Sequence, residues 1–243
     1  MGTWCDMPVW RVSRQGADMG ETVSIETTDG HQLTGYRAEP DGAPRGALVV
    51  IQEIFGVNSH IRSVADGFAD EGYIALAPAL FDRVAPGIEL GYTPADVENG
   101  REIRAKIDHE DAMRDMAAAV TALAGHPTGV VGYCWGGSLA WNAATRLDGV
   151  SAAVGYYGGM IPDMAGEQPR HPVMLHFGET DQSIPLEGVE KIKRAHPDVP
   201  VYMYPAGHGF NCDQRGHYHA ESAKLARERT LALFAEHVAG ESF

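Results

Sequence analysis

From residue 47 to the end of the chain, short apolar runs alternate with stretches of helical periodicity. The first run, Ala47–Ile51, is rich in β-branched residues and contains no polar position, which is typical of a strand covered on both faces. Helical spacing follows over residues 61–71, and Gly72 marks the stop before the next apolar run at 73–77. Repeated alternation of this kind predicts a mostly parallel sheet with helices on both faces.

The same pattern continues to the C-terminal part of the chain. Further strands are predicted at 129–133, 150–156, 173–177 and 201–204, and further helices at 113–124, 138–145, 189–195 and 223–234. Ahead of them, Asp29-Gly30 between two short apolar runs predicts an antiparallel hairpin, and the Pro- and Gly-rich stretch 83–100 predicts a long loop. We expect an α/β fold with about seven to eight strands, in one domain over residues 19–243 after a segment 1–18 without clear periodicity.

Charge and cysteine usage narrow the class of partner. A formal net charge of −14 argues against nucleic acid or an anionic membrane as the main partner, because both require a cationic surface. Three cysteines form no disulfide framework, which favours a reducing compartment. The sequence shows neither a signal-peptide pattern nor an apolar run of the roughly 20 residues that a spanning helix needs. We expect a cytoplasmic protein that acts on a small molecule.

The segment Gly132-Tyr133-Cys134-Trp135-Gly136-Gly137 falls where a predicted strand passes into a helix. It matches the nucleophile-elbow pattern, in which a sharp turn lifts a nucleophile above the sheet, with cysteine in the place of serine. The helix N-terminus adds a partial positive charge that favours a thiolate. The alternative is a buried packing cysteine in a glycine-rich turn.

Two later residues occur in the chain order that this fold uses for nucleophile, acid and base. Asp181 ends a Gly-x-x-Asp loop after the predicted strand 173–177, and His208 lies in a loop after the strand 201–204. Each has an ordinary alternative, since the aspartate could cap a turn and the histidine could be structural or exposed. Together with Cys134 they predict a triad of Cys134, His208 and Asp181.

Such a hydrolase also needs donors for a developing oxyanion. The amide after the nucleophile belongs to Trp135, and the amide of Ile54 follows the strand 47–51, so we predict these two as the donors. Glu53 lies at the same place and is a candidate regulator of the cysteine through hydrogen bonding or like-charge repulsion. Its alternative role is a carboxylate at a helix start that faces water.

At this point the sequence resembles the dienelactone hydrolase family, also called carboxymethylenebutenolidases, from about residue 19 to 238. The matching motifs are Gln52-Glu53-Ile54-Phe55-Gly56-Val57-Asn58, Ala77-Pro78 with Arg83 beyond it, Gly132–Gly137, Gly155-Tyr156-Tyr157-Gly158, the Asp181 loop, Gly207-His208-Gly209-Phe210 and Ala226-Arg227-Glu228-Arg229-Thr230. The resemblance implies an α/β-hydrolase fold and the triad above. It further implies that Glu53 contacts the resting thiol until substrate displaces it, and that Arg83 pairs with the substrate carboxylate.

The sequence departs from this family at the loop of the histidine. Characterised members have a serine after the catalytic histidine and a second carboxylate-binding arginine three residues further on, where this chain has Gly209 and Cys212. Arg215 in the same loop is a candidate substitute with different spacing. The departure leaves the preferred lactone open.

The sequence therefore predicts a hydrolase that opens an enol lactone or ester through a thioester intermediate. The resemblance further implies a small carboxylated substrate and a role in the degradation of aromatic compounds. We expect no cofactor, no metal and a monomer or weak homodimer, and we place His217 and His219 on a helix where they cannot share a face. Two alternatives remain. The chain could be a general carboxylesterase, or a non-catalytic module that uses its thiol for ligand binding or sensing.

Overall fold

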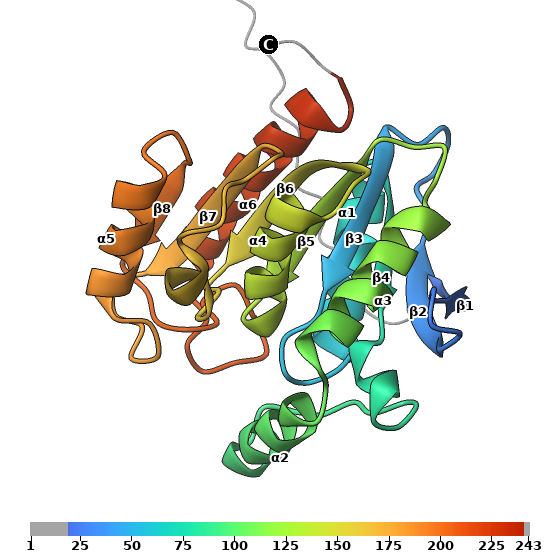
Figure 1. Cartoon of the computed structure of the whole chain (residues 1–243), viewed down its shortest axis with the longest axis horizontal. Coiled ribbons are helices and arrows are strands. Elements are labelled where there is room, and N and C mark those ends of the chain that lie inside the picture. Colours follow the sequence, from blue (N-terminus) through green and yellow to red (C-terminus); the bar gives the residue numbers. More distant parts are fainter. Residues whose placement is uncertain (1–18, 241–243) are drawn as a thin grey trace, which may run out of the picture.

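An eight-stranded, mostly parallel sheet forms the centre of the computed structural model, which describes residues 19–240 (Figure 1). The strand order is β1-β2-β4-β3-β5-β6-β7-β8, and only the pairings β1–β2 and β2–β4 are antiparallel. The strands are β1 (Glu21–Glu26), β2 (Gln32–Ala38), β3 (Gly46–Ile51), β4 (Tyr73–Pro78), β5 (Thr128–Tyr133), β6 (Val150–Tyr156), β7 (Val173–Gly178) and β8 (Val201–Tyr204). The predicted hairpin and mostly parallel sheet are confirmed.

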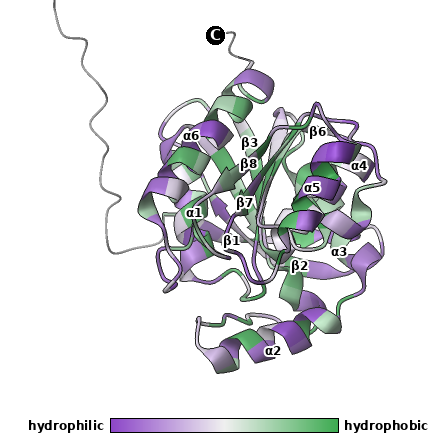
Figure 2. Ribbon diagram, turned by 90° about the vertical axis from the view of Figure 1, so that its left-hand side faces the viewer, coloured by the Kyte–Doolittle hydropathy of each residue, from purple (hydrophilic) through white to green (hydrophobic). Residues whose placement is uncertain are grey.

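Helices cover both faces of this sheet. Figure 2 shows α1 and α6 on one side of the strands and α3, α4 and α5 on the other. Every residue of β3, β4, β5 and β7 is consequently buried, which explains why these strands contain almost no polar residues. The helices are α1 (Ser59–Asp70), α2 (Pro94–Ala105), α3 (His109–Ala122), α4 (Trp135–Arg146), α5 (Leu186–Ala195) and α6 (Ala220–His237), with short 3₁₀ turns η1 (Leu80–Arg83) and η2 (Ile161–Met164).

Helix α2 corrects the predicted loop over 83–100. Thr93 and Asp96 form a capping box, in which the Asp96 backbone N–H donates to Thr93 Oγ1 at 3.2 Å and the Thr93 N–H donates to Asp96 Oδ2 at 2.9 Å. Pro94 occupies the first turn, where its missing N–H costs nothing. Pro94 therefore begins this helix instead of breaking it, and α2 projects beyond one end of the sheet (Figure 1).

Two other expectations concern segments at the ends of elements. His217 and His219 precede α6 instead of lying on it, and the His219 ring caps this helix by accepting from the Ser222 N–H. Residues 1–18 lie outside the described residues, and the expectation of one domain over 19–243 stays a prediction. No helix within residues 19–240 combines the length and apolar character needed to cross a membrane.

Candidate active site

Cys134 occupies the sharp turn between β5 and α4. Its φ of 55° lies in the left-handed region, which residues with a side chain rarely adopt. Close packing enforces this turn: a Cβ on Gly132 would stand 1.9 Å from the Gly136 carbonyl oxygen, and a Cβ on Gly136 would stand 2.5 Å from that of Gln52. Glycine at both positions lets strand and helix approach closely enough to present Cys134 at the carboxyl end of the sheet.

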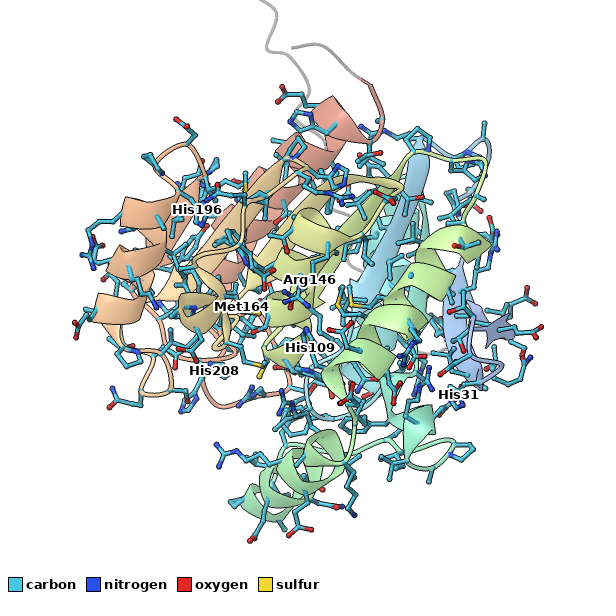
Figure 3. The ribbon with its side chains drawn as sticks, viewed as in Figure 1. His31, His109, Arg146, Met164, His196 and His208 are labelled. Atoms are coloured by element: carbon cyan, nitrogen blue, oxygen red, sulfur yellow. The ribbon has the colours of Figure 1, made fainter. Side chains whose placement is uncertain are left out.

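Cys134, His208 and Asp181 form a continuous chain of contacts. His208 Nε2 lies 3.2 Å from Cys134 Sγ, and His208 Nδ1 lies 2.7 Å from Asp181 Oδ2. The Asp181 side chain is buried, and its other oxygen accepts a hydrogen bond from the Ser183 N–H at 2.8 Å. The fold thus brings together the three residues that the sequence analysis selected. Figure 3 shows His208 at the end of the sheet where α2 also lies.

The surroundings of His208 favour its protonated form. Burial alone lowers the pKa of this ring, but its hydrogen bonds with Asp181 and Cys134 and the charges of these two groups outweigh that effect and raise the pKa to about 10. Nδ1–H then donates to Asp181 and Nε2–H points at the sulfur. His208 is thereby placed to donate one hydrogen bond to the carboxylate and one to the sulfur.

A cavity of about 750 Å³ opens onto this chain of contacts. Its size suits a small organic substrate. Ile54 and Trp135, the predicted oxyanion donors, both line it together with Cys134 and His208. Trp135 is the first residue of α4, so its backbone N–H has no partner within the helix and remains able to donate.

Three arginines give this cavity a positive lining inside an acidic protein. Arg101 and Arg104 come from α2, and Arg104 also stands over the Trp135 ring at 5.9 Å. Neither was predicted from the sequence, because no helix was expected between the loop 83–100 and the helix 113–124. Arg215 is the third, and it is the residue proposed from the sequence as a substitute in the histidine loop. A guanidinium fork is well suited to a carboxylate.

Glu53 and Gly209 fix the position of Arg215. The Arg215 Nη1 donates to Glu53 Oε1 at 3.0 Å, and the Glu53 side chain is almost fully buried. A Cβ on Gly209 would stand 2.5 Å from the same Nη1, and its φ is +76°. Glycine at this position therefore provides the space that the guanidinium occupies. The observed hydrogen bond of Glu53 is with Arg215, whereas Cys134 is hydrogen-bonded to His208.

Arg83 does not lie where the sequence analysis expected it. Its guanidinium binds Asp115 at 2.6 Å and Asp29 at 2.7 Å, and the Asp115 side chain is fully buried. The residues that line the cavity do not include Arg83. The reason is electrostatic: one carboxylate from the turn between β1 and β2 and one from α3 hold the guanidinium away from the residues that line the cavity. The expected contact with a substrate carboxylate stays a prediction.

Two further features near the cavity were not predicted. Tyr157 has a φ of 38°, and its ring packs against that of His208 with 5.0 Å between centroids, so it limits the movement of this histidine. Glu53, His60 and Cys212 form a buried group whose ligand atoms all lie within 4.8 Å of one another. No metal was expected from the sequence, and this group was not considered there, because Cys212 lies far along the chain from Glu53 and His60.

Comparisons with known proteins agree on one family. A sequence profile described as the dienelactone hydrolase family matches residues 33–238. The carboxymethylenebutenolidase of Pseudomonas putida is 36% identical over 230 residues, which cover 88% of this chain and 96% of the relative. A Synechocystis protein provisionally assigned the same activity is 37% identical over 241 residues, which cover 88% and 98%. A Klebsiella pneumoniae crystal structure, provisionally assigned as a dienelactone hydrolase, superposes with a TM-score of 0.79 at 31% identity, covering 89% and 99%. The predicted resemblance and α/β-hydrolase fold are confirmed.

The position of Arg83 predicts a structural effect of its removal. In Arg83→Met the buried Asp115 loses its main cation, so we expect the free energy of unfolding to fall by about 3 kcal/mol in urea denaturation. Arg114→Met, which removes a half-exposed arginine on the same helix as Asp115, should change it by less than about 0.5 kcal/mol. At 25 °C the Arg83 variant should keep the KM for a carboxylated lactone within about threefold. A tenfold rise in KM with an intact fold would contradict this placement.

The contacts of His208 predict its titration. Because Cys134 helps to raise the pKa of His208, Cys134→Ala should lower that pKa relative to the wild type, and Asp181→Asn should do the same. The folded-state pKa is raised, so the pair stabilises the fold fully below the unfolded value near 6.5 and loses this contribution as pH rises through about 10. Nitrogen-15 NMR of the imidazole between about pH 6 and about pH 11 measures the pKa of His208 in the wild type and in both variants. Identical titration curves in all three proteins would refute the pairing.

Proposed function

Because the chain belongs to the dienelactone hydrolase family and is a hydrolase of this type, we propose that it opens enol lactones or esters of small carboxylated acids through Cys134. The observation that carries the proposal is the geometry of one histidine. His208 Nε2 lies 3.2 Å from a sulfur, while its Nδ1 lies 2.7 Å from a buried carboxylate. Nucleophile, base and orienting acid are recognised by such contacts, irrespective of their places in the sequence.

The first half of the reaction forms a thioester. The Cys134 sulfur attacks the carbonyl carbon, and the carbonyl electrons move onto oxygen, where the N–H groups of Ile54 and Trp135 stabilise the charge. As the tetrahedral intermediate collapses, the bond from carbon to the leaving oxygen breaks. The imidazolium of His208 transfers its proton to this oxygen. An enol departs readily, which suits attack by a thiolate.

The second half releases the acid. Neutral His208 takes a proton from water, and the water oxygen attacks the thioester carbonyl. Collapse expels the Cys134 thiolate and restores the imidazolium beside it. Asp181 keeps Nδ1 protonated through both halves, so Nε2 always faces the reaction.

The arginines of the cavity support a carboxylated substrate. The cavity is lined by Cys134 together with Arg101, Arg104 and Arg215. A guanidinium can bind a carboxylate through two parallel hydrogen bonds. A substrate carboxylate that binds Arg215 competes with Glu53 for the same donor. Substrate binding thereby frees Glu53 from Arg215, which connects this residue to the state of the site without requiring contact with the resting thiol.

Two rival functions are separated by simple measurements. A general carboxylesterase would hydrolyse neutral esters as fast as carboxylated lactones, since it would gain nothing from three arginines in the cavity. A thiol-sensing module would bind ligand without turnover, and it would have no use for the Asp181–His208 hydrogen bond. The rates on paired neutral and carboxylated substrates decide among the three.

The setting of the reaction belongs to the same proposal. We propose a role in the degradation of aromatic compounds, and the free thiols of Cys134 and Cys212 suit the reducing cytoplasm. We further propose that the enzyme acts as a monomer or weak homodimer.

Removal of the nucleophile should abolish turnover. In Cys134→Ala we expect kcat/KM for an enol lactone to fall by about a thousandfold or more, because Cys134 is the only thiol among the described residues that line the cavity. Cys5→Ala, which removes a thiol elsewhere in the chain, serves as the matched control and should retain full activity. Steady-state kinetics on purified proteins give the answer, and an active Cys134→Ala variant would refute the mechanism.

Removal of Arg215 should affect charged substrates selectively. A charge-assisted hydrogen bond contributes about 1.5 to 3 kcal/mol, so Arg215→Met should lower kcat/KM for a carboxylated lactone by roughly ten- to a hundredfold. Its methyl ester should be affected less than about threefold. The double variant Glu53→Gln/Arg215→Met removes the buried carboxylate that would otherwise lose its partner. Equal losses on both substrates in this double variant would show that Arg215 does not bind the carboxylate.

A further inference from the structure

Beside the cavity, three side chains of different chemistry meet in a region closed to solvent. Glu53 follows β3, His60 lies in the first turn of α1, and Cys212 lies in the loop that carries His208. All three are buried, with 1%, 3% and 0% of their surface exposed. One carboxylate oxygen, one ring nitrogen and one sulfur lie within 4.8 Å of one another.

Two atoms of this group are buried without a hydrogen-bond partner among the described residues. They are Glu53 Oε2 and His60 Nε2. Burying a polar atom without a partner costs about 1 to 3 kcal/mol, so such atoms are rare in folded proteins unless something further binds them. Both belong to side chains whose other polar atom is already engaged, so these two atoms remain available to a ligand.

The surrounding groups orient the trio as they do in known metal centres. His60 Nδ1 lies 3.2 Å from Asp213 Oδ1, an arrangement that leaves Nε2 as the coordinating nitrogen. Glu53 Oε1 accepts from Arg215 at 3.0 Å, which leaves Oε2 free. Carboxylate–histidine pairs of this kind fix the tautomer and the ring orientation of metal-binding histidines.

We propose that Glu53, His60 and Cys212 form a binding site for a zinc ion, separate from the Cys134–His208–Asp181 contacts. A set of nitrogen, sulfur and carboxylate oxygen suits Zn²⁺, whereas magnesium and calcium prefer oxygen alone. Ligand atoms around tetrahedral zinc lie about 3.5 Å apart, given bonds of about 2.0 to 2.3 Å, so small side-chain rotations bring the trio to bonding distance.

Tyr92 lies beside the three residues. This phenol interacts with Cys212 and accepts a hydrogen bond from Asn58 Nδ2 at 3.1 Å.

The position of the ion gives it a structural consequence. The segment from Glu53 to His60 includes the Ile54 amide, and the loop of Cys212 includes His208. These two segments already meet in a hydrogen bond from Ser59 Oγ to Gln214 Oε1 at 3.1 Å. A zinc ion would bind them together more firmly, and so would stabilise both walls of the cavity without touching the substrate.

The test measures metal binding by the full-length protein, with activity left aside. After treatment with chelator, the protein is titrated with Zn²⁺ by calorimetry and with Co²⁺ by absorbance, since cobalt bound to a thiolate shows a charge-transfer band. We expect one ion per chain, a cobalt–thiolate band and a higher unfolding midpoint with zinc. Cys212→Ser, which keeps the size and polarity of the side chain, should lose the band and bind zinc at least about a hundredfold more weakly.

The matched control is Cys134→Ser, because Cys134, His208 and Asp181 also combine a thiol, an imidazole and a carboxylate. It should bind zinc and cobalt as the wild type does. His60→Gln should weaken binding as Cys212→Ser does, and circular dichroism verifies that each variant is folded. Absence of one-to-one binding, or a cobalt band that disappears in Cys134→Ser and persists in Cys212→Ser, would overturn the proposal. Neither result would bear on the hydrolytic role of Cys134.

Discussion

Close contact between the end of β5 and the first turn of α4 holds Cys134 in a backbone conformation that it would not adopt alone. Gly132 and Gly136 permit this contact because neither carries a Cβ. The sulfur therefore stands at the carboxyl end of the sheet. In a parallel sheet the carboxyl ends of neighbouring strands lie together, so the loops after β7 and β8 deliver Asp181 and His208 to hydrogen-bonding distance.

Those parts of the site that depend on strand ends could be predicted from the sequence. The apolar run that leads into Gly132, Cys134 and Gly136 is a local pattern, and it predicts both a buried strand and the tight turn after it. Asp181 and His208 could be predicted in the same way, because each lies in the loop that follows a predicted strand. Ile54 and Trp135 could be selected because their places follow from the strands before them, and both line the cavity.

The parts that depend on long side chains and distant partners could not. Arg83 has a plausible sequence position, but its direction is set by Asp115 and Asp29, which reach it from other elements. The arginines of α2 were hidden because a proline was interpreted as a helix breaker, although it stands in a first turn. Glu53 was noticed for its place beside the nucleophile, while its partner Arg215 and its neighbour Cys212 lie in a loop far along the chain. A local sequence pattern does not show which residues far apart in the chain will contact one another.

The central claim is that Cys134 accepts the acyl group of the substrate, and capture of the intermediate tests it most directly. Turnover of a slowly hydrolysed ester is stopped with acid, and the intact protein and its peptides are analysed by mass spectrometry. The account predicts one acyl group per chain, attached as a thioester to the peptide that contains Cys134 and released by hydroxylamine. An acyl group on any other residue, or continued turnover with Cys134 never modified, would contradict it.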